Sequence, residues 1–281
     1  MNDIGTALTW ATSLLLEHQL ADARLDAEIL LARVLNKNRA YLLAFAEQAL
    51  TASQKNKYQQ FITQRAQGIP IAYILKEREF WSLSLSVNEH TLIPRHETEQ
   101  LVDIALQYLP QTASIQLLDL GTGSGAIALA LAHERPQWCI HACDKSLEAL
   151  AIAKSNGSKH QLTNIQWYHS DWFTSLPPQH YDAILSNPPY IAAQDPHLTQ
   201  GDVFFEPRSA LVSEDAGLAD LQFISTQSIE RLKPGGLLLL EHGYDQKEAI
   251  QAILNKLGYI NVQCWQDLSG QDRISGGWKP L

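Results

Sequence analysis

Apolar and polar residues recur with different periods along this chain, and the period changes near residue 72. Between Asp22 and Leu35 an apolar residue recurs every three or four positions with charged residues in between, which is typical of an amphipathic helix. A second helix is expected to begin at Thr51 or Ser53 and to end at Gly68. We therefore expect residues 1–72 to form a small N-terminal helical bundle.

Residues 73–92 are expected to contain a β-hairpin, because part of this range has the period of a β-strand. Trp81 to Asn88 alternates strictly between apolar and polar residues, as a strand with one buried face does. Together with Glu77 to Phe80, this stretch predicts a short β-hairpin that links the bundle to the rest of the chain.

From Ile115 onward, predicted strands and helices alternate, which is the pattern of an α/β domain with a doubly wound, mostly parallel sheet. The predicted strands are 115–120, 138–143, 165–169, 181–186 and 236–241, followed by a terminal hairpin of 259–266 and 271–277. The predicted helices are 100–109, 125–134, 147–156, 218–232 and 245–257. These elements assign residues 93–281 to one domain with a seven-stranded sheet, in which residues 233–236 are expected to form a turn.

Composition narrows the class of protein. A length of 281 residues with 45% hydrophobic residues allows a large core and two domains. The formal net charge of −9 argues against a general nucleic-acid binder, which normally has a basic face. The three cysteines are too few for a disulfide framework or a zinc site, and no apolar run reaches membrane-spanning length. We expect a soluble, cytoplasmic, monomeric protein without a metal site or membrane contact.

Three alternating glycines follow the first predicted strand of the sheet. Gly121, Gly123 and Gly125 precede a run of small and apolar residues, where glycine lets the backbone approach a ligand and a helix N-terminus offers unpaired N–H groups. Gly121-x-Gly123-x-x-Ala126 also fits a permissive dinucleotide-binding fingerprint. The glycines alone therefore predict a nucleotide-like ligand and leave its kind open.

Two acidic residues narrow the choice of ligand. Asp119 stands just before the glycines, where a carboxylate would repel a pyrophosphate but suits the cationic methionine end of S-adenosylmethionine. Asp144 ends the next predicted strand, at the usual position of a carboxylate that accepts both ribose hydroxyls. The pair favours S-adenosylmethionine over NAD.

The stretch Ser186-Asn187-Pro188-Pro189-Tyr190 directly follows an apolar strand. Proline fixes its own φ and keeps the preceding residue extended, so the backbone at Asn187 and Pro188 is held extended. The Asn187 side-chain oxygen and the Pro188 carbonyl suit the two N–H groups of a planar NH2, with the Tyr190 ring stacked on its plane. This stretch predicts a site for methyl transfer to an amino or amide nitrogen.

In order and spacing, the glycine loop, the ribose carboxylate and Asn-Pro-Pro-Tyr resemble the class I S-adenosylmethionine-dependent methyltransferases that act on nitrogen. Further matches make the chain similar to the HemK family, the protein-(glutamine-N5) methyltransferases of peptide-chain release factors. These matches are Leu92-Ile93-Pro94-Arg95 with Thr98-Glu99, then Asp171-Trp172-Phe173, Phe205-Glu206-Pro207, Ala210-Leu211 and Glu241-His242-Gly243. The resemblance runs from the N-terminal helices to the C-terminus.

The resemblance implies roles for particular residues. S-adenosylmethionine is then the cofactor, held by Asp119, Gly121, Thr122, Gly123, Ser124, Gly125, Asp144, Asp171, Trp172 and Asn187. The substrate is the glutamine amide of the Gly-Gly-Gln loop of release factors, bound by Asn187, Pro188, Pro189 and Tyr190, of which Asn187, Pro188 and Tyr190 are catalytic. The bundle of residues 1–72 then holds the protein substrate. The chain departs from the family at Lys76, where glycine is usual, so the turn there is expected to differ.

Other functions fit parts of the pattern. A methyltransferase acting on an exocyclic amino group of a base in RNA or DNA would use the same Asn-Pro-Pro-Tyr logic, although the acidic charge and the helical bundle speak against it. A dehydrogenase fits the glycines alone, but Asp119 and the lack of a hydride-transfer constellation speak against it. A non-catalytic binding module would keep the fold and lose the site, whereas Asn187 and Asp144 are both present.

Overall fold

The computed structural model describes residues 2–281, which form two compact units. The first unit contains the chain up to Glu77 together with Thr199–Phe205, and the second contains Arg78–Leu198 and Glu206–Leu281. The predicted boundaries were 72 and 92. The structure groups the residues differently, because the helix after residue 70 packs in the first unit and a segment from the second half of the chain joins it.

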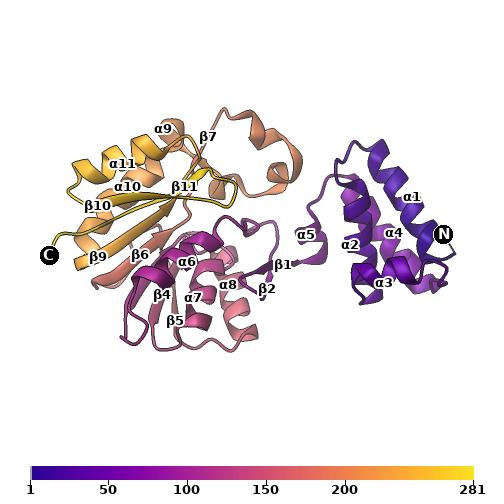
Figure 1. Cartoon of the computed structure of the whole chain (residues 1–281), viewed down its shortest axis with the longest axis horizontal. Coiled ribbons are helices and arrows are strands. Elements are labelled where there is room, and N and C mark those ends of the chain that lie inside the picture. The colour runs from indigo at the N-terminus through magenta and orange to yellow at the C-terminus, as the bar shows by residue number, and fades with distance from the viewer. Residues whose placement is uncertain (1) are drawn as a thin grey trace. The chain divides into compact units, whose positions relative to one another are not determined.

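The first unit is helical, as Figure 1 shows in indigo and purple. Its helices are α1 (Ile4–Glu17), α2 (Ala23–Leu35), α3 (Arg39–Ala44), α4 (Ala52–Ala66) and α5 (Ile71–Leu75). Capping boxes at Asp3 and Thr51 fix the starts of α1 and α4, because each cap side chain accepts a backbone N–H that the helix itself leaves unpaired. One apolar cluster, with buried Tyr58 and Ile62 of α4, holds the helices together.

Thr199–Phe205 is attached to the helical unit by an ion-pair cluster and a ring contact. Arg65 of α4 donates to Asp26 of α2 at 2.7 Å and to Asp202 at 2.8 Å. The Phe205 ring packs against Gly68, where a Cβ atom would come within 2.9 Å of the ring. Gly68 has φ +89, so both its conformation and its neighbour require glycine.

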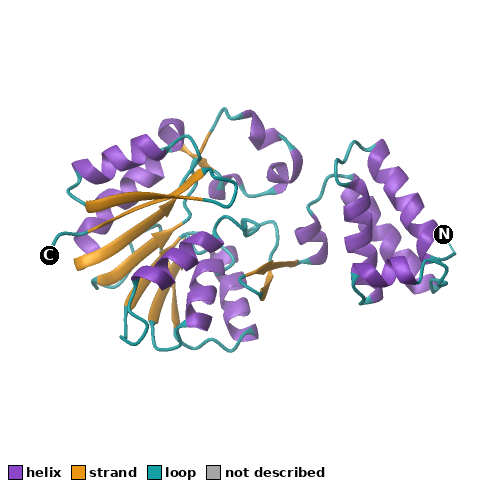
Figure 2. Ribbon diagram, in the orientation of Figure 1, coloured by secondary structure: helices purple, strands orange, loops and turns teal. Residues whose placement is uncertain are grey.

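The second unit is a seven-stranded sheet with helices on both faces (Figure 2). The strands lie in the order β10-β11-β9-β6-β3-β4-β5, and every pair is parallel except β11 with β9 and β10 with β11. Their bounds are β3 (Gln116–Leu120), β4 (Cys139–Asp144), β5 (Ile165–His169), β6 (Tyr181–Ser186), β9 (Leu232–Glu241), β10 (Ile260–Gln266) and β11 (Asp272–Trp278). This confirms the predicted α/β class and the terminal antiparallel hairpin.

The helices and short elements complete the second unit. The helices are α6 (Glu99–Tyr108), α7 (Ala126–Glu134), α8 (Leu147–Lys159), α9 (Glu214–Gly217), α10 (Ala219–Arg231) and α11 (Lys247–Lys256). The two-stranded pieces are β1 (Glu77–Phe80) with β2 (Leu83–Ser86), and β7 (Ile191–Ala192) with β8 (Val212–Ser213). The 3-10 turns are Pro196–Thr199 and Arg208–Ala210; a third, Gly201–Phe205, belongs to the first unit. The predicted hairpin is therefore present, but Trp81 and Ser82, with φ 51 and 59, form its turn, and its second strand is Leu83–Ser86 where a strand over Trp81 to Asn88 was predicted.

Neighbouring residues of one strand serve different cores. Leu117 of β3 belongs to the cluster formed with α6 and α7, whereas Leu118 belongs to the cluster formed with α10 and α11. Successive side chains of a strand point to opposite faces, so a strand buried on both faces is a continuous apolar run. This is why the predicted strands of the sheet read as unbroken apolar segments.

The turn predicted at residues 233–236 is wrong as an assignment, because β9 begins at Leu232. The strand is nevertheless irregular there: Tyr181 pairs with Leu232, Ala183 pairs with Leu237, and Gly235 has φ +74. Backbone bonds from Gly235 and to Gly236 are made with Lys279, so the C-terminal residues pair with the segment that was expected to turn.

Within residues 2–281, no helix has both the length and the apolar character needed to cross a membrane.

Candidate active site

A pocket lies in the second unit, at the carboxyl ends of the parallel strands, where α/β sheets bind ligands. Most of the residues predicted to bind a ligand line it: Gly121, Thr122, Gly123, Ser124, Asp144, Asp171, Trp172, Asn187 and Pro189. Four others do not line it: Asp119, Gly125, Pro188 and Tyr190. The structure thus brings together residues from the ends of adjacent strands that are far apart in sequence.

Two glycines of the loop are required for different reasons. Gly123, with φ +57, faces open space, and a Cβ atom there would meet nothing within 4 Å. Gly125, with φ +90, leaves no such space, because a Cβ atom would come within 2.9 Å of Leu129 and 3.3 Å of Ala153. Gly123 therefore keeps backbone open toward the pocket, and Gly125 allows α7 and α8 to pack closely.

Asp144 lies on the pocket wall and binds the backbone of the glycine loop. Its Oδ2 accepts the N–H of Gly123 at 2.8 Å, and its Oδ1 accepts the N–H of Ser146 at 2.9 Å. Burial raises the pKa of Asp144, and these two backbone donors act in the opposite direction. Each carboxylate oxygen retains acceptor capacity, so Asp144 has the chemistry to bind hydroxyl groups of a ligand.

Asp119 lies beneath the loop and not on the pocket wall. Its carboxylate is fully buried, and Oδ2 accepts from Thr122 Oγ1 at 2.6 Å and from the N–H of Ala128 at 3.2 Å. Burial raises the pKa of Asp119 to about 7. Its Oδ1 has no hydrogen-bond partner, which leaves an unused buried acceptor at the start of α7. The residue ties the loop to the helix that follows it.

Asp171 and Trp172 follow β5 and form another part of the wall. Trp172 has φ +47 and is half-buried, with its indole N–H 3.2 Å from Asp220 Oδ1. A Cβ atom on Gly121 would lie 3.3 Å from the Trp172 ring, so the ring packs directly over the glycine loop. A flat apolar surface is thereby presented beside the loop.

Asn187 lines the pocket at the end of β6. Its Nδ2 donates to Thr98 Oγ1 at 3.0 Å, and the structure gives its Oδ1 no partner among residues 2–281. Thr98 Oγ1 in turn donates to Glu241 Oε2 at 2.7 Å. The free Oδ1 is an acceptor available to a ligand.

Tyr190 is placed differently from the expectation that its ring stacks on the substrate. It does not line the pocket; its hydroxyl donates to Glu241 Oε1 at 3.2 Å, and its ring packs against the apolar cluster of α10 and α11. Burial and the neighbouring Glu241 carboxylate raise the pKa of Tyr190 well above its ordinary value.

Sequence analysis assigned no individual role to Thr98 or Glu241. Both stand in short motifs quoted above, Thr98-Glu99 and Glu241-His242-Gly243, but neither motif shows which residue the other contacts. Arg95 was also left without a partner, and the structure pairs it with Glu206, whose Oε2 accepts the N–H of Ile93 at 3.0 Å. The available signals were a carboxylate at the last residue of a predicted strand, for Glu241, and a hydroxyl residue just before a predicted helix, for Thr98.

These residues fit an adenosine-bearing cation. The open backbone at Gly123, the Asp144 carboxylate and the Trp172 ring offer, respectively, close approach, hydroxyl binding and a flat apolar surface. Two acidic residues on the wall beside the loop, Asp144 and Asp171, suit a positively charged ligand better than a pyrophosphate.

Comparisons with known proteins agree with this fit. The PrmC N-terminal domain family matches residues 6–75, and the methyltransferase small domain family matches residues 96–216. The solved structure of a methyltransferase from Pyrococcus furiosus has a TM-score of 0.54 and 18% identity, covering 80% of this chain and 99% of its own. It shows the fold. Fold and site together define the chain as an S-adenosylmethionine-dependent methyltransferase.

Relatives identify the family more closely. The release factor glutamine methyltransferase of Shewanella oneidensis is 49% identical over 99% of this chain and 97% of its own length. That of Salmonella typhimurium is 49% identical over 92% of this chain and 95% of its own. The chain belongs to the family of release factor glutamine methyltransferases.

Proposed function

We propose that this protein methylates the side-chain amide nitrogen of the glutamine in the Gly-Gly-Gln motif of peptide-chain release factors, using S-adenosylmethionine. The observation that carries the chemistry is the Asn187 side chain. Its Nδ2 is taken by Thr98, and its Oδ1 remains free on the pocket wall. A free carbonyl-type oxygen at this position is suited to accept an N–H of a primary amide.

Orientation is the main contribution that these residues make to the reaction. An amide nitrogen is a poor nucleophile, because its lone pair is delocalised into the carbonyl. Asn187 Oδ1 accepts one amide N–H and so directs the nitrogen lone pair. The second N–H is assigned to the carbonyl of Pro188, which does not line the pocket itself but lies between two residues that do, Asn187 and Pro189. Holding reactants in a productive arrangement accounts for roughly 7 to 11 kcal/mol of barrier lowering in favourable cases.

The same acceptors act on the charge that develops. When bound, S-adenosylmethionine supplies an electrophilic methyl group on a sulfonium. The substrate nitrogen gains positive character as its bond to the methyl carbon forms and the carbon–sulfur bond breaks; S-adenosylhomocysteine leaves, and the nitrogen then releases one N–H proton. Acceptor oxygens at the N–H groups stabilise the developing charge without reorganising. This step needs no strong general base in contact with the nitrogen.

Cofactor binding is assigned to the loop and the wall beside it. Asp144 binds the ribose hydroxyls, the backbone from Gly121 to Gly125 approaches the nucleoside, and Asp171 and Trp172 border the adenine. Asp119 acts from below by holding Thr122 and the start of α7, and not through the contact with the cationic methionine end that the sequence predicted.

We also assign the unit that binds the protein substrate, the oligomeric state, the location and the class of substrate. The helical unit binds the release factor, the chain acts as a monomer in the cytoplasm, and nucleic acid is not a substrate. The net charge of −9 supports the last of these, since it opposes approach to a phosphate backbone.

A transfer assay tests the function. Methyl-labelled S-adenosylmethionine is incubated with the protein and, separately, with release factor, RNA and DNA. We expect label on release factor alone, located on the glutamine of the Gly-Gly-Gln motif by mass spectrometry. Label on RNA or DNA, with none on release factor, would overturn the proposal in favour of a nucleic-acid methyltransferase.

A further inference from the structure

Glu241 is a buried carboxylate at the end of β9 that does not itself line the pocket but contacts Thr98, which does. It is 1% exposed, and its two oxygens accept from two segments far away in sequence. Thr98, just before α6, donates to Oε2, and Tyr190, four residues after the end of β6, donates to Oε1. Burying a carboxylate is costly unless it is satisfied, so these donors are not incidental.

The donor directions in this cluster are determined by Glu241. An ionised carboxylate accepts and cannot donate, so the single hydroxyl proton of Thr98 is committed to Glu241. The Thr98 oxygen can then only accept from Asn187, which requires that the Asn187 group facing it be the NH2. The carboxylate therefore fixes which end of the Asn187 amide is free.

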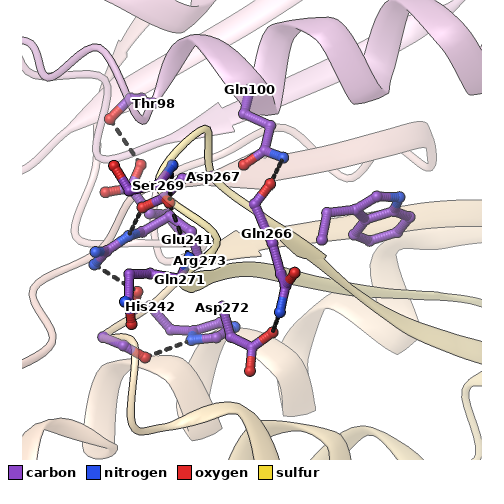
Figure 3. Close-up of polar contacts among 12 residues, drawn as sticks. Thr98, Gln100, Glu241, His242, Gln266, Asp267, Ser269, Gln271, Asp272 and Arg273 are labelled. Carbon is purple, nitrogen blue, oxygen red and sulfur yellow. Dashed lines mark hydrogen bonds and ion pairs between the residues drawn. The ribbon is translucent and has the colours of Figure 1, made fainter.

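A positive charge lies on the other side of the carboxylate. Arg273 of β11 stands beside β9, where its carbonyl accepts the N–H of His242, and its charge acts to lower the pKa of Glu241. Its Nη1 is 3.4 Å from the carbonyl of His242, and its Nε is 3.5 Å from Asp267 Oδ2. Figure 3 shows Thr98, Glu241 and Arg273 in this cluster, with Asp267 in the hairpin loop after β10.

We propose that Glu241 and Thr98 are positioning residues for methyl transfer: they hold the Asn187 amide with Oδ1 toward the substrate and fix Tyr190 at the same carboxylate. This inference rests on the proposed function, because it assigns Asn187 Oδ1 to the acceptor amide. Without the Thr98 hydroxyl, the Asn187 amide is free to rotate and to present an NH2 donor where an acceptor is needed.

The most direct test is Thr98→Val, which keeps the shape of the side chain and removes its hydroxyl. Thr98 precedes α6 but makes no side-chain cap bond, so the substitution does not uncap the helix. We expect kcat for release factor to fall about 10- to 100-fold, the range that misplacement of a reacting group produces. KM for S-adenosylmethionine stays within about twofold, because the glycine loop is untouched. Thr98→Ser retains the hydroxyl and restores most of the rate.

Ser225→Ala is the matched control. Ser225 of α10 is fully buried, and its hydroxyl donates to the Leu221 carbonyl without touching the cluster. It therefore reports what loss of a buried hydroxyl in this unit does by itself. We expect a kcat equal to that of the unmodified protein.

A second experiment, which combines Thr98→Val with Asn187→Ala, tests whether Thr98 acts through Asn187. If it does, Thr98→Val lowers the rate by less than about twofold when Asn187 is already alanine, since contacting residues are non-additive. A purely structural role would lower the rate by the same factor in both backgrounds. That result, or an undiminished kcat in Thr98→Val, would overturn the inference.

A readout without catalysis separates this inference from the proposed function. The side-chain amide NMR signals of Asn187, assigned by their loss in Asn187→Ala, should exchange slowly with solvent and do so faster in Thr98→Val. If the unmodified protein transferred no methyl group while this protection was present, the proposed function would fail and the positioning geometry would stand. Equal exchange in both proteins would refute the positioning geometry.

Discussion

At the scale of single residues, the nitrogen and the oxygen of the Asn187 side-chain amide have different roles. Nδ2 donates to Thr98, whereas Oδ1 has no partner among residues 2–281, and we assign it to the substrate. The cofactor, by contrast, is assigned to the glycine loop and Asp144, which Asn187 does not support by any hydrogen bond. Binding of cofactor and transfer of the methyl group should therefore be separable.

Asn187→Ala is expected to leave cofactor affinity within a few-fold and to reduce turnover by ~10² to 10³, the usual effect of losing one acceptor or donor aimed at developing charge. Cofactor binding is measured by calorimetry and turnover by label transfer to release factor. Asn255→Ala, an exposed asparagine of α11, is the control and should behave as the unmodified protein. Near-normal turnover in Asn187→Ala would contradict the assigned mechanism.

Turnover is also expected to depend on pH through Glu241. Burial raises the pKa of Glu241 to about 7, while Thr98, Tyr190 and Arg273 act to lower it and Glu97 to raise it. The ionised form accepts from both hydroxyls, so the rate should rise as pH increases through about 7 and fall below it. The pH profile of kcat is the measurement.

Two variants assign that inflection. Tyr190→Phe removes a donor that favours the ionised form, so the inflection should move to higher pH. Glu241→Gln should give a low rate without the inflection, because an amide offers one acceptor and one donor and does not titrate. If the inflection persisted in Glu241→Gln, another group would be responsible, such as Asp119, whose pKa also lies at about 7.

At the scale of elements, the glycine loop is held by the strand next to it. Asp144 at the end of β4 accepts the N–H of Gly123, so loss of the carboxylate is expected to remove the proposed ribose contact and also to loosen the loop. S-adenosylmethionine at about 100 times its dissociation constant should stabilise the protein by roughly 2.7 kcal/mol. Asp144→Ala is expected to abolish most of the corresponding thermal shift, whereas NAD should produce none in either protein.

The end of α5 contains a local strain. Lys76 has φ 55 and ψ 32, the left-handed conformation in which a Cβ atom is disfavoured by about 1 to 2 kcal/mol. Lys76→Gly should raise the free energy of unfolding by up to about 1 kcal/mol, because the greater freedom of glycine in the unfolded chain offsets part of the gain. Chemical denaturation measures it. Lys76→Ala keeps the Cβ and should change little; equal stability of the two variants would contradict the strain.

At the scale of elements, the strands could be predicted from the sequence, whereas contacts between distant segments could not. The strands of the sheet were predictable, because residues such as Leu117 and Leu118 face two separate cores and produce unbroken apolar runs. The turn at 233–236 was not, since its pairing with Lys279 depends on the other end of the chain. The same holds for the Thr98–Glu241 and Asn187–Thr98 bonds. The spacing of residues along the sequence does not reveal contacts between segments that are far apart in the chain.

For the whole molecule, the feature of most consequence is the Arg65 cluster in the helical unit. The Arg65 side chain is 11% exposed, and that of Asp26 is 8% exposed, so the pair is largely shielded from water. Burial raises the pKa of Asp26, which shows what its charge would cost without a partner. Asp202 completes the cluster from Thr199–Phe205.

Arg65→Ala is therefore expected to destabilise the helical unit by roughly 3 to 5 kcal/mol, the range for removing one member of a buried ion pair. Urea unfolding followed by a probe in the helical unit measures it. Arg33→Ala is the control: the Arg33–Glu77 pair has side chains 46% and 34% exposed, so its loss should cost less than about 1 kcal/mol. Comparable losses in the two variants would show that burial does not govern these pairs.

Thr199–Phe205 has a further consequence for the integrity of the chain. The polypeptide leaves the helical unit after Glu77, returns to it at Thr199 and leaves again after Phe205, so the chain passes between the units three times. A protease that cuts near Glu77 would sever only one of these connections. Asp202 would still bind Arg65, and Phe205 would still cover Gly68, which would keep the two fragments of the nicked chain together. The fragments should co-purify after such a cut, and separately produced halves should reassociate on mixing.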